Sequence, residues 1–348
     1  MKRHSETTIH DIAKKLNISA STVSRALNNN PLISRKTCEL IKKTAAEMGY
    51  RPNVLAANLR TKKTKTIGVI VPLINRHFFS SVISGIEDIA YRSGFTVTIS
   101  QSNDLLEKES YIAHALFANR VDGLIISIGM ETKEYSHLQL FSERGIPLVF
   151  FDRVVDEIEA NKIVVDDFGG AFKATRHLVG QGCKRIAHIG GPLNLNIYRN
   201  RLNGYKAALE ESGFEIDDSL ALHTNLTRED GANSAKQLLQ LPDTPDAIFC
   251  ANDTTALSAI TYFKDIGKKV PEEIAIVGFS NEPFSEVVTP SISTIKQPGF
   301  QMGQKAAELL LNQINGFKAR QFETFVMPTE LVVRESSRRL KGYPETAN

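Results

Sequence analysis

The apolar residues in the first 50 positions recur at the spacing of short helices. Between Ile9 and Leu16 they fall at i, i+3, i+4 and i+7, with Thr8 placed as the N-cap. Two more such runs follow Ser19 and Ser34, and each serine is a suitable N-cap. Three short helices with a tight turn between the first two predict a helix-turn-helix unit.

The second of these helices has the surface expected of a helix that enters DNA. Val23 and Leu27 are predicted to face inward, and the outward positions are small or hydroxylated apart from one arginine: Ala20, Ser21, Ser24 and Arg25. Small side chains let a helix enter the major groove, and an arginine can pair with guanine through two hydrogen bonds. A bundle that docks another protein is the alternative.

The distribution of charge favours DNA over that alternative. The chain has 348 residues and a net charge of +3, but residues 1–65 contain 14 Lys and Arg against 4 Asp and Glu. The first 65 residues therefore carry a net +10 and the remainder a net −7. A small basic module joined to a larger acidic body is typical of a nucleic-acid binder with a separate sensing or catalytic domain.

From Thr66 onward, short apolar runs alternate with segments long enough for a helix. The runs are TIGVIV, FTVTIS, GLIISI and PLVFFD in a first block, then RIAHIG, LALHT, AIFCAND and IAIVGF in a second, and the blocks meet near residues 163–167. This alternation predicts βαβ units and parallel sheets. The predicted fold is therefore an all-α helix-turn-helix domain followed by an α/β core of two doubly wound parallel sheets, with a ligand cleft at the carboxyl ends of the strands.

Polar and aromatic residues follow these strands, where such a cleft would lie. An aromatic floor surrounded by Asp, Arg and Asn suits a polyol, because a sugar offers an apolar face and a ring of hydroxyls. The candidates for the effector-binding site are His77, Phe78, Phe79, Asp152, Arg153, Arg201, Asn252, Ser280 and Gln297. Asn75 and Arg76 precede His77 in the loop after the first strand. Each could instead have a structural role, since aspartate caps and surface arginine pairs are common.

The segment between the two predicted domains is a candidate hinge. Asn53 can cap the run from Val54 to Leu59, but a helix of about six residues is far below the 12 to 15 needed for stability alone in water. We therefore expect this helix to form only on DNA. An ordinary linker is the alternative.

Other classes of protein are disfavoured by what the sequence contains. No apolar run approaches the roughly 18 to 20 residues of a membrane span, and the first residues do not have the pattern of a signal peptide, so we expect a cytoplasmic protein. Cys38, Cys183 and Cys250 have the spacing of neither a disulfide framework nor a metal site. Phosphate-loop, dinucleotide, nucleophile-elbow and zinc-hydrolase motifs are missing, so we expect no catalytic residues, no metal and no cofactor.

Two long stretches together resemble one known family. TTIHDIAKKLNISASTVSRALNNNPLISRKT, followed by MGYRPNVLAANLRTKKTKTIGVIVP, is similar to the DNA-binding domain, hinge and first core strand of the lactose-repressor (LacI) family of bacterial transcription regulators, and the resemblance covers residues 7 to 339. It implies that Ala20 and Ser21 select bases and that Arg25 contacts a base. The positions implied to touch phosphates, or to support such contacts, are Thr8, Ser19, Thr22, Asn28, Tyr50 and Asn53.

The resemblance also implies a role for the hinge. In the family, two hinge helices from a dimer pack together in the minor groove, and a leucine at the position of Leu59 inserts into the central base step. Ala56 lies on the same predicted hinge helix and is expected, like Leu59, to contact DNA. An apolar wedge of this kind kinks the duplex and links the shape of the DNA to the ordering of the protein.

The family's architecture divides the chain as follows. The helix-turn-helix domain spans 1–50, the hinge helix and linker 51–65, the effector-binding and dimerisation core 66–340, and a tail 341–348. Within the core, lobe 1 takes about 66–163 and 296–325, and lobe 2 about 164–295 and 326–340. The resemblance implies that Phe79, Asp152, Arg201, Asn252 and Gln297 line the effector cleft. Ser280 departs from the family's frequent Asp, and Arg153, Arg199, Arg201 and His77 are basic, so a sugar acid is a hypothesis for the effector beside a neutral sugar.

These observations predict a repressor of a carbohydrate-utilisation operon. We expect a homodimer, or a tetramer built from two dimers, on a pseudo-palindromic operator, because a two-fold dimer presents two recognition helices to two half-sites. A small molecule in the cleft would bias the closure of the lobes and thereby the pairing of the hinge helices. A periplasmic solute-binding protein and an enzyme on a doubly wound scaffold are the alternatives, and neither accounts for the basic amino-terminal module.

Overall fold

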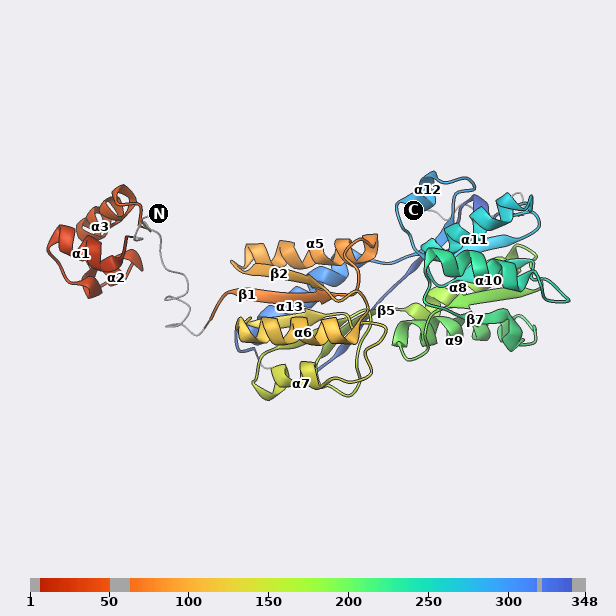
Figure 1. Ribbon diagram of the computed structural model, residues 1–348, viewed down its shortest axis with the longest axis horizontal. Helices are drawn as coiled ribbons and strands as arrows, with labels where there is room; N and C mark the ends of the chain where they lie inside the picture. Colours follow the sequence, from red (N-terminus) through yellow and green to blue (C-terminus); the bar gives the residue numbers. More distant parts are fainter. Residues whose placement is uncertain (1–6, 51–62, 318–320, 340–348) are drawn as a thin grey trace. The chain divides into compact units, whose positions relative to one another are not determined.

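The computed structural model describes residues 7–50, 63–317 and 321–339, and the chain forms two compact units that divide between Thr64 and Lys65 (Figure 1). The predicted hinge contacts Asn53, Ala56 and Leu59, and the tail 341–348, lie outside the described residues. No helix among the described residues is long and apolar enough to cross a membrane.

The first unit contains the three predicted helices. They are α1 (Ile9–Leu16), α2 (Ala20–Leu27) and α3 (Arg35–Glu47). Thr8, Ser19 and Ser34 cap them as predicted, each side-chain oxygen accepting a hydrogen bond from the backbone N–H three residues later. The small core is built from two buried residues of each helix: Ile12, Ala13, Val23, Ala26, Ile41 and Ala45.

One detail of α2 differs from the sequence-based expectation. Ala20 does not face fully outward, because it is half-buried and packs against this core, as does Leu27. Ser21 and Arg25 are exposed, as expected, whereas Ser24 is half-buried. The surface offered by α2 therefore centres on Ser21 and Arg25.

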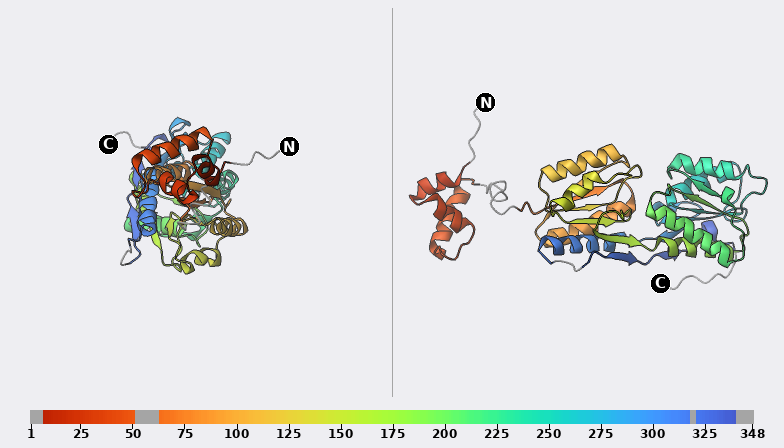
Figure 2. Two further views of the ribbon diagram at one scale, coloured as in Figure 1. Left: turned by 90° about the vertical axis from the view of Figure 1, so that its left-hand side faces the viewer. Right: turned by 90° about the horizontal axis from the view of Figure 1, so that it is seen from below.

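The second unit consists of two lobes, each with a six-stranded sheet (Figure 2). The first sheet has the order β11-β5-β4-β3-β1-β2 and is entirely parallel. Its strands are β1 (Thr66–Val71), β2 (Thr96–Gln101), β3 (Gly123–Ile126), β4 (Leu148–Phe151), β5 (Asn161–Val165) and β11 (Thr324–Met327). Its helices are α5 (His77–Arg92), α6 (Leu106–Ala118), α7 (Ser136–Glu143) and α13 (Gly299–Ile314).

The second sheet has the order β12-β10-β9-β8-β6-β7. It is parallel except at one edge, where β12 runs antiparallel to β10. Its strands are β6 (Ile186–Gly190), β7 (Ala221–His223), β8 (Ala247–Cys250), β9 (Ala275–Ser280), β10 (Ser293–Lys296) and β12 (Glu330–Val332). Its helices are α8 (Asp167–Gly180), α9 (Asn196–Glu211), α10 (Arg228–Leu238), α11 (Asp253–Asp265) and α12 (Phe284–Val287), with two short 3-10 turns at Asp218–Leu220 and Glu335–Ser337.

Alternate residues along the central strands bury their side chains on opposite faces of each sheet. In the first lobe Val69 packs with α5 and α13, whereas Ile70 packs with α6 and α7. In the second lobe Phe249 packs with α8 and α9, whereas Ile248 packs with α10 and α11. Both faces of both sheets are thus covered by helices, as expected for the near-continuous apolar strands.

The chain crosses between the lobes at three places: after β5, after β10 and after β11. The carboxyl ends of the parallel strands in one lobe therefore face those of the other. This arrangement positions the polar residues that follow the strands.

The helices α5 and α13 approach each other more closely than side chains would allow. A Cβ atom on Gly85 would lie 2.0 Å from the Phe300 carbonyl oxygen, and one on Gly303 would lie 2.0 Å from the Val82 carbonyl oxygen. Both obstructing atoms belong to the backbone and cannot rotate away. The two glycines therefore permit this helix pair to cover one face of the first sheet.

We predict that Gly85→Ala destabilises the core. The added methyl group meets backbone atoms of Phe300 and Gln304, so the free energy of unfolding should fall by about 1 to 3 kcal/mol. Thermal and urea unfolding of the full chain, followed by circular dichroism, measure the change. Ser84→Ala, at an exposed position of the same helix, is the control and should stay within about 0.5 kcal/mol of wild type. Equal stability of the two variants would contradict the close approach.

Candidate functional site

The exposed face of the first unit is built on the start of α2. The Ser19 hydroxyl accepts a hydrogen bond from the Thr22 backbone N–H at 3.1 Å and lies 2.8 Å from the hydroxyls of both Ser21 and Thr22. Arg25 is exposed and forms no ion pair with any residue that the structure describes. The helix thus presents hydroxyls and one uncommitted cation, a combination suited to phosphates and to guanine.

The other predicted DNA contacts of this unit are placed around the helix ends. The Thr8 hydroxyl donates to Asp11 at 2.7 Å within the capping box of α1. The side-chain amide of Asn28 donates to the Ser24 carbonyl at 2.7 Å, and Tyr50 packs against the small core. These residues fix the local geometry of the helices, which is a supporting role for phosphate contacts.

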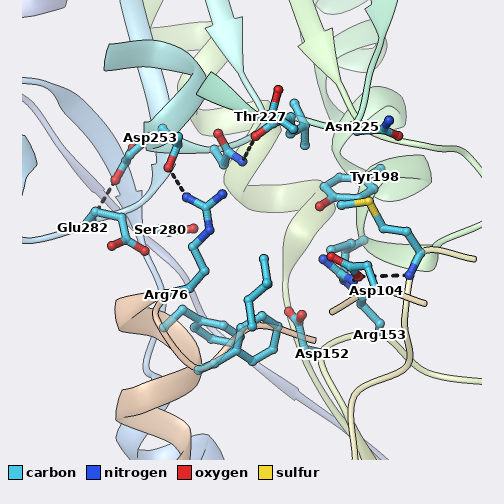
Figure 3. Close-up of a pocket in the computed structure, with 18 of the residues that line it drawn as sticks. Arg76, Asp104, Asp152, Arg153, Tyr198, Asn225, Thr227, Asp253, Ser280 and Glu282 are labelled. Carbon is cyan, nitrogen blue, oxygen red and sulfur yellow. Dashed lines mark hydrogen bonds and ion pairs between the residues drawn. The ribbon is translucent and has the colours of Figure 1, made fainter. Parts of the chain in front are cut away.

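A cavity of about 340 Å³ lies between the two lobes of the second unit (Figure 3). Eight of the nine predicted effector-binding residues line it: Phe78, Phe79, Asp152, Arg153, Arg201, Asn252, Ser280 and Gln297. The ninth, His77, lines a separate cavity of about 390 Å³ instead, where Phe78, Ser280 and Gln297 also contribute. Further residues complete the lining of the first cavity: Leu73, Arg76, Asn103, Asp104, Leu105, Met130, Glu131, Ile197, Tyr198, Asn225, Leu226, Thr227, Asp253, Thr254 and Glu282.

Aromatic rings form part of the wall. Phe79 packs edge-on against Phe78, with ring centroids 5.3 Å apart, and against Phe151 at 6.2 Å. Tyr198 adds a ring from the second lobe (Figure 3). An apolar ring face of a ligand can therefore be covered from both lobes.

Asp152 is the acid at the centre of this wall. It follows β4, is 3% exposed, and its carboxylate accepts no hydrogen bond from any residue that the structure describes. Burial raises the pKa of this carboxyl, although Arg153 and Arg201 oppose the shift. A buried, unpartnered carboxylate open to a cavity is costly unless a ligand supplies hydrogen-bond donors, so Asp152 is well placed to receive hydroxyl groups.

Arg153 and Arg201 have carboxylate partners of their own. Arg153 pairs with Asp104 and contacts the Ile128 carbonyl, and its Nε is buried with no partner among the described residues. Arg201 pairs with Asp167, with both Nε and Nη2 2.7 Å from the same carboxylate oxygen. Neither guanidinium therefore brings an uncompensated charge to the cavity.

The second lobe supplies polar groups from the start of α11 and the end of β9. The Asn252 side chain caps α11, since its oxygen accepts from the Thr255 N–H at 2.8 Å and its amide donates to the Leu226 carbonyl at 3.1 Å. Asp253 is fully buried, and burial raises the pKa of its carboxyl to about 6 against the effect of its hydrogen bonds from Thr294 and from the Glu282 backbone N–H. Asn252 is thus largely committed to the fold, whereas Ser280 contributes a small hydroxylated surface to the lining.

Unusual backbone conformations gather at this cavity. Five lining residues other than glycine have a positive φ in the left-handed region: Asn103, Asp104, Asp152, Leu226 and Ser280. Such conformations cost free energy and tend to occur at ligand-binding and catalytic positions. Their gathering at strand ends marks the cavity as a functional site independently of its shape.

The charge of the cavity differs from the basic cleft suggested by the sequence. Its lining holds three arginines (Arg76, Arg153, Arg201) but five acids (Asp104, Glu131, Asp152, Asp253, Glu282). Arg199 is not among the lining residues and donates to the Leu193 carbonyl at 3.3 Å. An acidic effector is therefore not favoured, because His77 and Arg199 do not line this cavity. Arg153 and Arg201 do line it, but both are paired with carboxylates.

Several lining residues were missed by sequence reasoning. Asp104 and Tyr198 were not singled out, and Arg76 was noted only as a member of the loop after the first strand. Asp104 follows β2, so the strand-end rule that found Asp152 could have found it as well. Tyr198 lies within α9, and no sequence signal separated it from a core residue.

The rims of the cavity are joined by hydrogen bonds between the lobes. Arg76, from the first lobe, donates to the hydroxyl of Thr254 at the start of α11 (Figure 3). At another point Asn196 of the second lobe donates to the Asp152 carbonyl at 3.0 Å and accepts from the Val154 N–H at 3.1 Å. Specific hydrogen bonds thus join the two lobes in the structure.

Comparison with known proteins identifies both units. Residues 8–53 match the family model of bacterial regulatory proteins of the lacI family, and residues 175–337 match a periplasmic binding protein-like domain. The chain is 34% identical over 340 residues to the HTH-type transcriptional repressor CytR of Escherichia coli (strain K12), covering 97% of this chain and 98% of that protein. It is 31% identical to the repressor PurR of Vibrio atlanticus (strain LGP32), covering 96% and 99%.

Solved structures show the same architecture. The lac repressor dimer bound to operator and the anti-inducer ONPF has a TM-score of 0.84 at 28% identity, covering 96% of this chain and 99% of that one. A complex of the transcriptional regulator CelR with cellobiose has a TM-score of 0.73 at 28% identity, covering 95% and 100%. Together, the helix-turn-helix unit, the two-lobed core and the extent of these similarities show that the chain belongs to the LacI family of bacterial regulatory proteins and is a DNA-binding transcription regulator.

Proposed function

We propose that this protein is a repressor whose operator affinity is set by a neutral, hydroxyl-rich small molecule bound in the cavity between the lobes. The observation that carries the proposal is Asp152, a buried carboxylate without a hydrogen-bond partner among the described residues, facing a cavity with aromatic walls. Sugar hydroxyls would supply the missing donors, and the rings would cover the apolar face of a sugar. Similar regulators in a complex with cellobiose and in a crystal structure with bound ribose support this ligand class.

The charge balance supports a neutral ligand over an acidic one. The cavity has more acids than arginines, and an additional carboxylate would be repelled by Asp152, Glu131 and Glu282. Its volume of about 340 Å³ lies near the lower end of the range for small-molecule sites. These features favour a compact polyol over a large or highly charged metabolite.

DNA binding would be coupled to this site through the hinge. We propose that two copies of the chain bind a pseudo-palindromic operator with α2 in the major groove, and that Asn53, Ala56 and Leu59 contribute hinge contacts. An effector that favours the hinge-paired form would act as a corepressor, and one that favours the unpaired form as an inducer.

A ligand panel tests the effector class. Thermal unfolding of the full chain is recorded with neutral sugars and polyols, the corresponding sugar acids, and nucleosides. A ligand at about 100 times its dissociation constant stabilises by about 2.7 kcal/mol, which shifts the melting temperature by a few degrees. Stabilisation by neutral sugars or polyols supports the proposal, whereas stabilisation by sugar acids alone contradicts it.

We predict that Asp152→Asn weakens effector binding and leaves DNA binding without effector unchanged. Asn keeps the shape but loses the charge that strengthens hydrogen bonds from hydroxyls, so affinity should fall by about 1.5 to 3 kcal/mol. Calorimetric titration with the panel's best neutral ligand measures this change. Asp156→Asn removes a carboxylate that is 81% exposed and paired with Lys162, and as the control it should bind the effector like wild type. Loss of affinity in both variants would argue against a contact at Asp152.

We predict that Arg25→Ala lowers specific DNA binding by about 1 to 3 kcal/mol and relaxes one base preference, because its guanidinium is exposed and uncommitted on α2. Binding sites selected from a random DNA pool, followed by affinity measurements at fixed salt, give both quantities. Arg35→Ala is the matched control, since Arg35 lies on α3 and pairs with Glu39 at 3.1 Å. An unchanged base preference in the Arg25 variant would exclude the predicted contact.

A further inference from the structure

A buried ion pair stands behind the cavity wall in the second lobe. Asp167 is the first residue of α8 and its side chain is 1% exposed, while that of Arg201 is 4% exposed. Both Nε and Nη2 of Arg201 lie 2.7 Å from one oxygen of Asp167. Arg201 lines the cavity and Asp167 does not, so Asp167 can reach a ligand only through Arg201.

The surroundings fix the guanidinium in one orientation. Nη1 of Arg201 donates to the Ala251 carbonyl at 2.7 Å, and the ring of Phe279 lies 3.6 Å from the central carbon. A guanidinium has five N–H groups, of which Nε and Nη1 each donate one to these partners, while Nη2 lies in ion-pair contact with the same Asp167 oxygen on its near side. Two N–H groups remain to contact a ligand, and one face of the group is covered by an aromatic ring.

We propose that Asp167 is the residue that determines the charge specificity of the cavity: it holds Arg201 in place and cancels its charge, so that the two remaining N–H groups bind uncharged oxygen atoms in preference to carboxylates or phosphates. This inference deepens the proposed function and rests on it. Asp167 is a positioning residue, because it acts through Arg201.

The state of the second carboxylate oxygen supports this role. Oδ2 of Asp167 is buried and has no hydrogen-bond partner among the described residues. Burial raises the pKa of the carboxyl to about 7, with Asp152 and Asp166 adding to the shift and Arg201 opposing it. The negative charge of Asp167 therefore compensates Arg201 above pH 7. This compensation is lost as the pH falls through 7, when the Asp167 carboxyl takes up a proton.

A purely structural role for Asp167 makes a different prediction. If the pair only stabilised the second lobe, replacing Asp167 would change the melting temperature without changing which ligands bind. A role in charge specificity requires a change in the preference between two ligands of equal shape and different charge. Acetate and acetamide are such a pair, since they differ in charge but hardly in size.

The test compares Asp167→Asn with wild type and with Asp166→Asn in the full chain. Asn at 167 keeps an oxygen for Arg201 but removes the compensating charge. Asp166 is the adjacent carboxylate and caps α8 through the Gly169 N–H at 2.8 Å. Asp166→Asn therefore makes the same change of charge one residue away, at a side chain that forms no ion pair with Arg201, and by lowering the pKa of Asp167 it keeps that carboxyl ionised at pH 8. The affinity of each protein for acetate and for acetamide is measured at pH 8 and constant ionic strength, from the shift in melting temperature.

We expect Asp167→Asn to shift the acetate-to-acetamide affinity ratio toward acetate by about tenfold, while Asp166→Asn keeps the wild-type ratio. The same shift in both variants, or in neither, overturns the inference. The sugar panel remains a separate measurement on wild-type protein. A panel without neutral hits would therefore contradict the proposed effector class while the acetate ratio still reports on Asp167.

A second measurement covers the case in which Asp167→Asn does not fold. In wild-type protein the acetate-to-acetamide ratio should rise as the pH falls from 8 to 6, because protonation of Asp167 frees the charge of Arg201. Asp253 also lines the cavity and burial raises its pKa to about 6, so the same rise must appear in Asp253→Asn. Acetate itself stays ionised throughout this range. A ratio that is constant from pH 8 to pH 6 overturns the inference without the need for a variant.

Discussion

The parallel pairing of the strands is the constraint on which the cavity depends. Parallel strands end at the same edge of a sheet, and three chain crossings turn these edges of the two lobes toward each other. Residues that follow the strands are polar because the chain turns there, yet the opposing lobe removes them from water. Each charged side chain at this edge must therefore either pair with another residue or remain without a hydrogen-bond partner in the cavity.

The pattern of pairing explains what the cavity can bind. Arg153 and Arg201 are matched by Asp104 and Asp167, which cancels most of the positive charge that the strand ends supply. Asp152 remains without a hydrogen-bond partner among the described residues, because the arginines nearest to it are already engaged. A ligand that fits this cavity must therefore donate hydrogen bonds to Asp152 without carrying a charge of its own. Hydroxyl groups meet this requirement.

Sequence reasoning located the site well and its electrostatics poorly. Periodicity and capping residues predicted the three amino-terminal helices, and the strand-end rule found Asp152 because it depends only on local order along the chain. The resemblance to the family pointed to Phe79 and Arg201, which lie within α5 and α9. The charge balance depends on contacts between distant segments: Arg153 pairs with a residue 49 positions away and Arg201 with one 34 positions away. No local pattern reports such pairs, so a cleft that looked basic in sequence is not basic in the fold.

The hydrogen bonds across the cleft indicate how much free energy a ligand must supply to change the arrangement of the lobes. Arg76 to Thr254 and the two bonds of Asn196 join the lobes, so a motion that separates the lobes at these points must break them. A net hydrogen bond contributes about 0.5 to 1.5 kcal/mol, so a few such bonds amount to a few kcal/mol. Allosteric coupling free energies are typically about 1 to 3 kcal/mol. A ligand that adds or removes one or two bonds across the cleft can therefore change the balance between its open and closed forms by the amount that regulation requires.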